Sequence, residues 1–178
     1  MRHGDPQREN AVYRIFASRG CPFHCSFCYN NQYRRIYEGL GRYHRRRSVE
    51  NVLAEMEIAV RSLPSIRRMR FDDDSFVFPA DWIDRFAGEY PRRVGLPFDV
   101  LLNPNAFNPA QLEKLRDAGL DHVQVGIQSA TEKELERDFK RKGSREKIVD
   151  LAKTLHDLDI AMTFDIILDN PMAGDENK

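Results

Sequence analysis

The sequence predicts an α/β fold, a partial parallel (β/α) barrel of about five β/α units, on the strength of two observations. Short apolar runs recur along the chain, and a turn and an amphipathic helical stretch follow each of the first four. Strands that alternate with helices form a parallel sheet, because each crossover must cover a face of the sheet. Five units are too few for a closed eightfold barrel. A doubly wound open sheet is the alternative.

The predicted strands are residues 12–17, 66–71, 98–102, 122–127 and 162–168. The first long helix, residues 49–63, follows Ser48, a residue type that caps helix N-termini, and ends before Pro64. The second, residues 80–90, is predicted to end at Pro91 because proline interrupts the helical hydrogen-bond ladder.

The later helices carry the same signals. Residues 109–118 begin with a proline and stop at Gly119, and residues 131–140 and 144–158 are separated at Gly143. The longest stretch with no regular pattern is residues 29–47. That length is unusual in a compact domain, so we expect the segment to be either functional or mobile.

Composition indicates a single domain over residues 1–178. Hydrophobic residues make up 41% of the chain and charged residues 31%, ordinary values for a globular protein. Neither a membrane-spanning run nor an apolar signal region is present, so a cytoplasmic location is expected. Residues 1–70 carry 14 Arg against 6 Asp and Glu, a net charge of +8. This basic half either attracts a phosphate-bearing partner or is simply a solvated surface.

The three cysteines of the chain, Cys21, Cys25 and Cys28, lie within the segment CPFHCSFC directly after the first predicted strand. Ligands of parallel α/β folds bind at the carboxyl ends of the strands, where this loop lies. Tetrahedral zinc requires four ligands, and locally only His24 could join the thiols. An iron–sulfur cluster with three cysteine ligands is the other solution, since one iron then stays open.

At these residues the sequence resembles the radical S-adenosylmethionine (SAM) superfamily. The Cys-x-x-x-Cys-x-x-Cys spacing and aromatic Phe27 before the last cysteine carry the resemblance. It implies that a 4Fe–4S cluster on Cys21, Cys25 and Cys28 binds SAM and cleaves it reductively. The resulting 5′-deoxyadenosyl radical then abstracts hydrogen from a substrate, which the sequence leaves unknown.

The resemblance also implies cofactor contacts at the ends of later strands. Asp72, Asp73 and Asp74 match the position that holds the SAM amino group, although the more usual Gly-Gly-Glu is absent. Gln128 and Ser129 match a segment that contacts the ribose or methionine part. Arg141, or Lys140 beside it, matches a basic residue that pairs with the cofactor carboxylate.

Two further sequence features bear on the expected cofactors. Asn103 follows the third strand and either donates hydrogen bonds into the barrel mouth or forms a turn. The sequence Asp169-Asn170-Pro171, with Gly174 beyond it, resembles the cobalamin-dependent subgroup, whose cobalamin would bind a domain absent from this chain. The family's partial barrel usually has six strands, so the chain is expected to lack the C-terminal end of the domain.

A small-molecule or macromolecular substrate and a reductase or flavodoxin-type electron donor are the implied partners. Tyrosines and arginines alternate in residues 29–47, a composition that can bind nucleic acid, but the family more often uses this region around the cluster. We therefore expect neither nucleic-acid nor membrane binding. A tRNA-modifying methylthiotransferase-like radical enzyme and a non-enzymatic zinc-binding module remain the alternatives.

Overall fold

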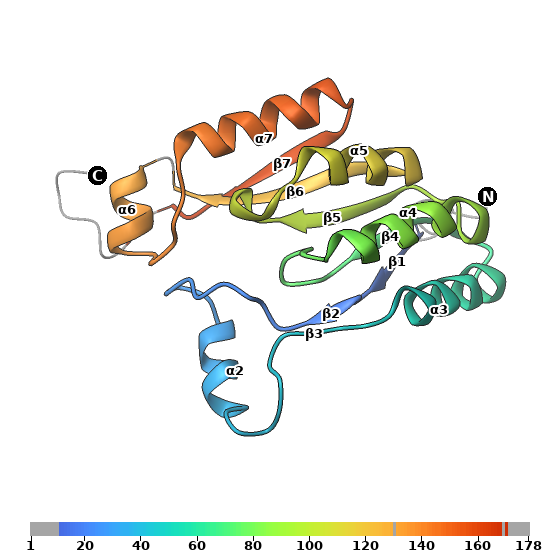
Figure 1. Cartoon of the computed structure of the whole chain (residues 1–178), viewed down its shortest axis with the longest axis horizontal. Helices are drawn as coiled ribbons and strands as arrows, with labels where there is room; N and C mark the ends of the chain where they lie inside the picture. Colours follow the sequence, from blue (N-terminus) through green and yellow to red (C-terminus); the bar gives the residue numbers. More distant parts are fainter. Residues whose placement is uncertain (1–10, 130, 169, 171–178) are drawn as a thin grey trace, which may run out of the picture.

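A computed structural model of the chain describes residues 11–129, 131–168 and 170. Its centre is a five-stranded parallel sheet in the order β1-β4-β5-β6-β7, drawn in Figure 1. The strands are β1 (Ala11–Ile15), β4 (Ile66–Phe71), β5 (Phe98–Leu102), β6 (Leu120–Gln128) and β7 (Ala161–Ile166). All five predicted strands are present, and the largest shift of an end is two residues.

The strand order decides between the two predicted architectures. Each strand is added beside the previous one in the same direction, and right-handed crossovers then place every helix on the same face of the sheet. A doubly wound sheet would reverse direction at a switch point. The covering helices are α3 (Val49–Ser62), α4 (Ala80–Arg93), α5 (Pro109–Ala118) and α7 (Arg145–Asp157), and neighbours in this series contact one another. The fold is therefore the predicted partial β/α barrel.

Aromatic rings fill the space between the helices and the central strands. Phe86 of α4 is fully buried, and its ring centroid lies 5.7 Å from that of Phe71 on β4 and 5.1 Å from that of Trp82. Phe98 on β5 completes the cluster at 5.7 Å from both Phe71 and Phe86. Burying such large apolar rings is the main force that holds the helical layer on the sheet.

The opposite face of the sheet is charged. Side chains alternate along a strand, so Arg68 and Arg70 of β4 point away from the helices that cover Met69 and Phe71. Arg70 lies 3.3 Å from Asp99 and 3.2 Å from Asp72, and Arg68 lies 2.5 Å from Asp121. These pairs line the concave side of the barrel, so that side is a polar surface held by ion pairs between strands.

Residues 29–47 are more regular than the sequence indicated. Helix α2 (Asn30–Ile36) begins two residues after Cys28, and β3 (Arg45–Arg46) pairs antiparallel with β2 (Ser18–Arg19). The expectation of a wholly irregular segment was wrong. Helix α2 has a polar face and exposed tyrosines instead of an apolar stripe, which is why the helical pattern was missed.

Two helix boundaries also differ from the prediction. Helix α4 continues through Pro91 to Arg93, whose guanidinium pairs with Glu50, Glu57 and Glu89 and so holds the last turn. Helix α6 (Glu132–Arg137) is shorter than residues 131–140, because the chain turns at Asp138 toward the cysteine loop. Within the described residues, no helix combines the length and apolarity needed to cross a membrane.

Candidate functional site

The cysteine loop follows β1 and the short strand β2, at the carboxyl end of β1, and leads into α2. This region lies at the left in Figure 1. Its turn depends on Gly20, whose φ of +75° is unfavourable for other residues. A Cβ atom at this position would lie 2.8 Å from the carbonyl oxygen of Tyr43. The glycine therefore lets residues 20–28 fold back over the end of the sheet.

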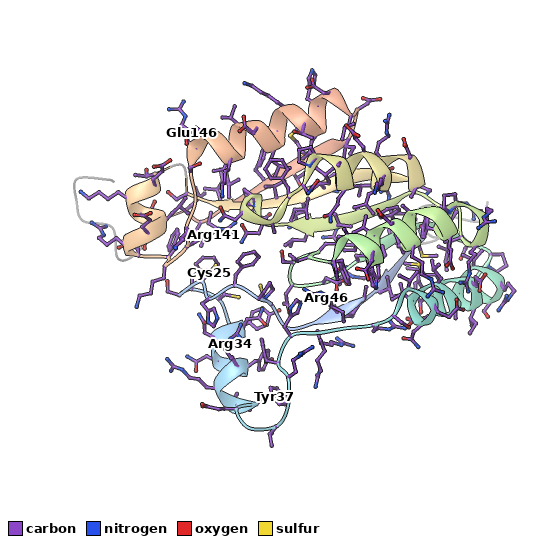
Figure 2. All side chains as sticks on the ribbon, in the orientation of Figure 1. Cys25, Arg34, Tyr37, Arg46, Arg141 and Glu146 are labelled. Carbon is purple, nitrogen blue, oxygen red and sulfur yellow. The ribbon has the colours of Figure 1, made fainter. Side chains whose placement is uncertain are left out.

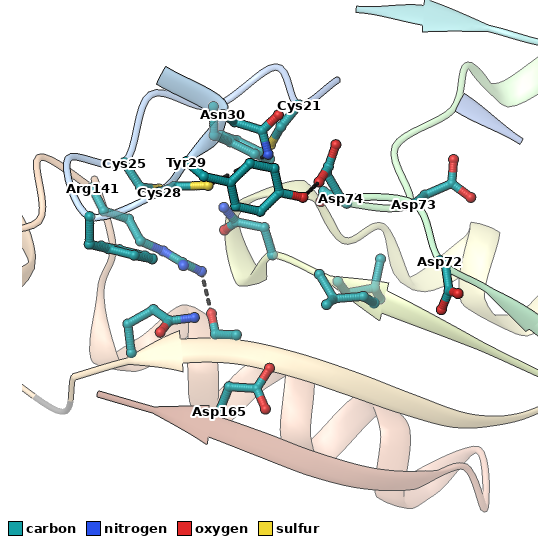
Figure 3. A pocket seen from close by; sticks show the side chains of 18 of the residues that line it. Cys21, Cys25, Cys28, Tyr29, Asn30, Asp72, Asp73, Asp74, Arg141 and Asp165 are labelled. Carbon is teal, nitrogen blue, oxygen red and sulfur yellow. Dashed lines mark hydrogen bonds between the residues drawn. The ribbon is translucent and has the colours of Figure 1, made fainter. Parts of the chain in front are cut away.

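Figure 3 shows the three thiols on one wall of a cavity of about 300 Å³. The opposite wall consists of strand ends: residues 70–75 at the end of β4 and just beyond it, Asn103 after β5, Gly126 and Gln128 of β6, and Asp165 of β7. The structure thus brings together residues that are up to 144 positions apart in the sequence, Cys21 and Asp165. The cavity lies where parallel α/β folds hold their ligands.

The cysteines are free, and the protein largely shields them. Cys21 and Cys25 are each 8% exposed, and Cys28 is half-buried. Burial raises the pKa of the Cys21 thiol to about 11 and also raises that of Cys25, where the nearby Arg141 opposes the shift. Because iron binds the thiolate form, loading of this site with metal would release protons.

Hydrogen bonds fix the backbone of the loop. Arg34 donates from Nη2 to the carbonyl oxygen of Cys21 at 2.7 Å, and Asn31 donates from Nδ2 to that of Cys25 at 2.5 Å. The backbone amide of Ser26 donates a hydrogen bond to the carbonyl oxygen of Phe139 at 2.9 Å. Phe27 packs edge-on against the Phe139 ring, with 5.2 Å between centroids, and also lines the cavity. The loop is thereby held from both α2 and the segment after α6.

The three consecutive carboxylates have three different surroundings. Asp72 pairs with Arg14 and Arg70 on the concave face of the sheet. Asp73 is 2% exposed and accepts hydrogen bonds from the Ala17 amide and the Ser18 hydroxyl. Burial raises the pKa of the Asp73 carboxyl, which those hydrogen bonds oppose. Asp73 thus fastens the start of the cysteine loop to β4.

Asp74 is the member of this group that faces the cysteines. It accepts a hydrogen bond from the Tyr29 hydroxyl at 2.5 Å, and this bond is the largest cause of the raised pKa of Tyr29. Both residues line the cavity beside Cys28. Of the three carboxylates, Asp74 has the position best suited to a ligand held against the thiols.

On the β6 side, the predicted residues separate into two groups. Gln128, with a positive φ of 69°, and Asn103 line the cavity, and Asn103 also accepts a hydrogen bond from the Asn105 amide at 3.0 Å. Ser129 is buried outside the cavity lining, where its hydroxyl donates to Glu134 and accepts from the Thr131 amide. Its hydroxyl therefore shapes the turn into α6.

Arg141 connects the cysteine loop to β6. It is 8% exposed, donates a hydrogen bond from Nη2 to the Gly126 carbonyl, and has its guanidinium beside Cys25, as Figure 2 and Figure 3 show. Lys140, the alternative candidate, is exposed. Within the pair, only Arg141 lines the cavity. Asp169, Pro171 and Gly174, which suggested the cobalamin subgroup, lie outside the described residues.

Several lining residues were not among the predicted cofactor contacts. Ser75 is 2% exposed, lines the cavity, and its hydroxyl has no hydrogen-bond partner among the described residues. Asp165 faces the same space and accepts two hydrogen bonds from Gln124, at 2.8 and 3.0 Å. Asp165 had a usable signal, a lone carboxylate within an apolar strand, whereas Ser75 looked like an ordinary turn residue.

The donor set fits an iron–sulfur cluster. Each thiol of a cubane ligates a different iron, so three thiols spread along one wall are suitable ligands. No three His, Cys, Asp or Glu side chains of the described residues are arranged around a single metal ion. The unpartnered hydroxyl of Ser75 adds a polar group that a ligand in the cavity would satisfy, because buried polar atoms are costly when unpaired.

The model of the Radical SAM superfamily matches residues 15–171 of this chain. A protein of Pyrococcus horikoshii described as an uncharacterized methyltransferase, PH0819, is 29% identical over 143 residues. That match covers 79% of this chain and 29% of the relative. The chain therefore spans less than a third of the length of that protein.

Solved structures share the fold at low sequence identity. The radical SAM methyltransferase TsrM from Kitasatospora setae, with cobalamin and a [4Fe-4S] cluster bound, has a TM-score of 0.72 and 20% identity. It matches over 89% of this chain and 31% of its own. The cobalamin-dependent enzyme OxsB has a TM-score of 0.73 and 20% identity, over 92% of this chain and 25% of its own. Coproporphyrinogen III oxidase (HemN) from Escherichia coli has a TM-score of 0.60 and 16% identity, over 89% of this chain and 37% of its own.

Proposed function

Because this chain belongs to the Radical SAM superfamily, we propose that it is the core of an enzyme that cleaves S-adenosylmethionine reductively and abstracts hydrogen from a substrate. The observation that carries the proposal is the cavity itself. Three free cysteines form one wall, and because no disulfide joins them, all three thiols are available to iron. The facing wall supplies carboxylate, amide and guanidinium groups.

Cys21, Cys25 and Cys28 would hold the cluster, and Phe27, which precedes Cys28, packs edge-on against Phe139 and lines the same cavity. When bound, the cluster would supply the electron that cleaves the sulfonium of SAM, and the radical released would remove hydrogen from the substrate. The protein keeps the reacting space partly closed to water, since two of the three thiols are 8% exposed.

The strand ends would hold the cofactor's polar groups. Asp74 offers a carboxylate to an ammonium group, and Arg141 offers a guanidinium to a carboxylate. Gln128 and Asn103 add two side-chain amides to the cavity lining, and Asp165 adds a hydrogen-bond acceptor. Asp72 and Asp73 have a supporting role in this proposal, because ion pairs and hydrogen bonds already engage them.

Anaerobic reconstitution with iron and sulfide tests the function. We expect uptake of about four irons per chain and, with SAM and dithionite, formation of 5′-deoxyadenosine. Stoichiometric zinc binding with no iron uptake would favour the zinc-binding module instead and would refute the proposal.

Methyl transfer is the second candidate function. Both PH0819 and TsrM are described as methyltransferases, and the bound cobalamin in TsrM and OxsB fits a cobalamin requirement. The products distinguish the two candidates. Formation of S-adenosylhomocysteine, dependent on added cobalamin, supports methyl transfer, whereas 5′-deoxyadenosine alone supports hydrogen abstraction.

Ser75→Ala tests whether SAM occupies the cavity. The hydroxyl has no partner among the described residues, so its removal should leave the stability of the unloaded chain unchanged or raise it slightly. If SAM uses the hydroxyl, its affinity should fall by about 0.5–1.5 kcal/mol, roughly 2- to 13-fold. Calorimetric titration of the reconstituted protein with SAM measures the change. The exposed Ser65→Ala, which lies before β4 and outside the cavity lining, is the control, and equal affinities of Ser75→Ala and the unchanged chain would exclude this contact.

A further inference from the structure

A second cavity, of about 400 Å³, lies between α2 with the segment that follows it and the paired strands β2 and β3. We call it the tyrosine–arginine basin and define it by Tyr33, Tyr37, Tyr43, Arg19, Arg42 and Arg45. It shares Tyr29, Asn30 and Asp74 with the cofactor cavity, so the two spaces have a common wall. We infer that the basin is the docking surface through which a small acidic electron-transfer protein reduces the cluster.

The charge of the basin favours an acidic partner. Among the described residues, no carboxylate lies within ion-pair distance of Arg19, Arg42 or Arg45, which all line the basin. The lining contains three arginines and one carboxylate, that of Asp74, which gives a net charge of +2. Unpaired arginines on a concave surface attract and orient a negatively charged protein.

The apolar part of the basin has the composition of a protein interface. Tyr33 of α2 is 48% exposed, Tyr37 at its C-terminal cap is 53% exposed, and the two ring centroids lie 6.4 Å apart. Leu40, at the rim, is 71% exposed. Tyrosine and arginine are enriched at protein–protein contacts, because each buries a large area and keeps a polar end. Figure 2 shows Tyr37 at the C-terminal end of α2, below Cys25.

The basin also has a short connection to the cluster loop. The hydroxyl of Tyr43 donates to Oδ1 of Asn30, and Nδ2 of Asn30 lies 3.5 Å from the sulfur of Cys28. Asn30 is 4% exposed, and this one buried side chain lies between the basin and the Cys28 thiol. An electron carrier that docks in the basin is therefore one side chain away from a cluster ligand.

The inference rests on the proposed function, which needs one external electron for each SAM cleaved. The donor protein, a low-potential flavoprotein of the flavodoxin type, loses one electron and the cluster gains it, with no bond made or broken in this step. Nucleic acid is the competing occupant of an arginine–tyrosine surface. The observations favour the protein, because the basin shares Asn30 with the wall beside Cys28, and a position next to a cluster ligand serves electron delivery and has no role in holding a nucleic acid.

The test compares two reductants on the reconstituted protein. We expect Arg42→Glu/Arg45→Glu to lower the rate of cluster reduction by reduced flavodoxin about tenfold or more at low salt, since charge steering changes association rates by this order. Reduction by dithionite, a small ion that needs no docking surface, should stay within about twofold of the original rate. Bleaching of the cluster's visible absorbance, followed by stopped flow, measures both rates.

Arg61→Glu/Arg92→Glu is the matched control. Both arginines are exposed on the helical layer, on α3 and α4, and the charge change is the same. This control should retain the flavodoxin rate. Equal flavodoxin rates for the basin variant and the control would overturn the inference, as would tight binding of a single-stranded RNA that the basin variant alone loses while its flavodoxin rate is unchanged. Failure of dithionite to reduce any cluster would instead refute the proposed function itself, and the inference with it.

Discussion

Replacement of Cys21, Cys25 or Cys28 by Ala is expected to reduce the iron content after anaerobic reconstitution from about four per chain to well below one. Each thiol faces the cavity, and among the described residues no other cysteine exists to replace it. With the cluster lost, formation of 5′-deoxyadenosine should fall to the background of a reaction without protein. Iron and sulfide analysis, together with the product assay, measures both effects.

His24→Ala is the control for the cysteine variants. His24 is exposed and adjacent to Cys25, and it is the residue that a zinc site in this loop would need as a fourth ligand. The radical SAM assignment requires nothing from it, so His24→Ala should keep its iron and its activity. Loss of metal in His24→Ala, with retention in any one of the cysteine variants, would contradict the assignment of the three thiols as the cluster ligands.

Arg141→Ala is expected to weaken SAM binding by about 1–3 kcal/mol, roughly 5- to 150-fold. The guanidinium is almost fully buried, so its pairing with a carboxylate is little screened by water. The substitution also leaves the Gly126 carbonyl without the hydrogen bond from Nη2. Titration of the reconstituted variant with SAM measures the affinity.

Two further variants separate the contact with the cofactor from the support of the loop. Arg141→Lys keeps the positive charge but cannot bond to Gly126 and a carboxylate through a planar fork, so an intermediate affinity is expected. Lys140→Ala, which removes an exposed charge one position away, should bind SAM within about twofold of the original chain. A loss in Lys140→Ala that exceeds the loss in Arg141→Ala would move the carboxylate contact to Lys140.

The fold could be predicted because its signals are local. The run of Ile66–Phe71, the cap at Ser48 and the stop at Gly119 each act within a few residues, and the structure confirms all three. Helix α2 could not be predicted in this way. Its tyrosine and those at its two caps are exposed, so the sequence has no apolar stripe that would indicate a helix. The helix forms because it packs on the cysteine loop through Asn31 and Arg34, contacts that sequence periodicity does not contain.

The features of the candidate site likewise fall into two groups, those that are local in the sequence and those that depend on tertiary contacts. The three cysteines and the strand ends could be recognised from the sequence alone, because residue types and their spacing are local features. Only the tertiary structure decided which of Asp72, Asp73 and Asp74 faces the thiols, that Ser129 caps a turn, and that Ser75 and Asp165 line the cavity. The physical reason is that a side chain's role depends on which partners surround it. Those partners, such as Ser18 for Asp73 and Tyr29 for Asp74, come from segments 45 or more residues away.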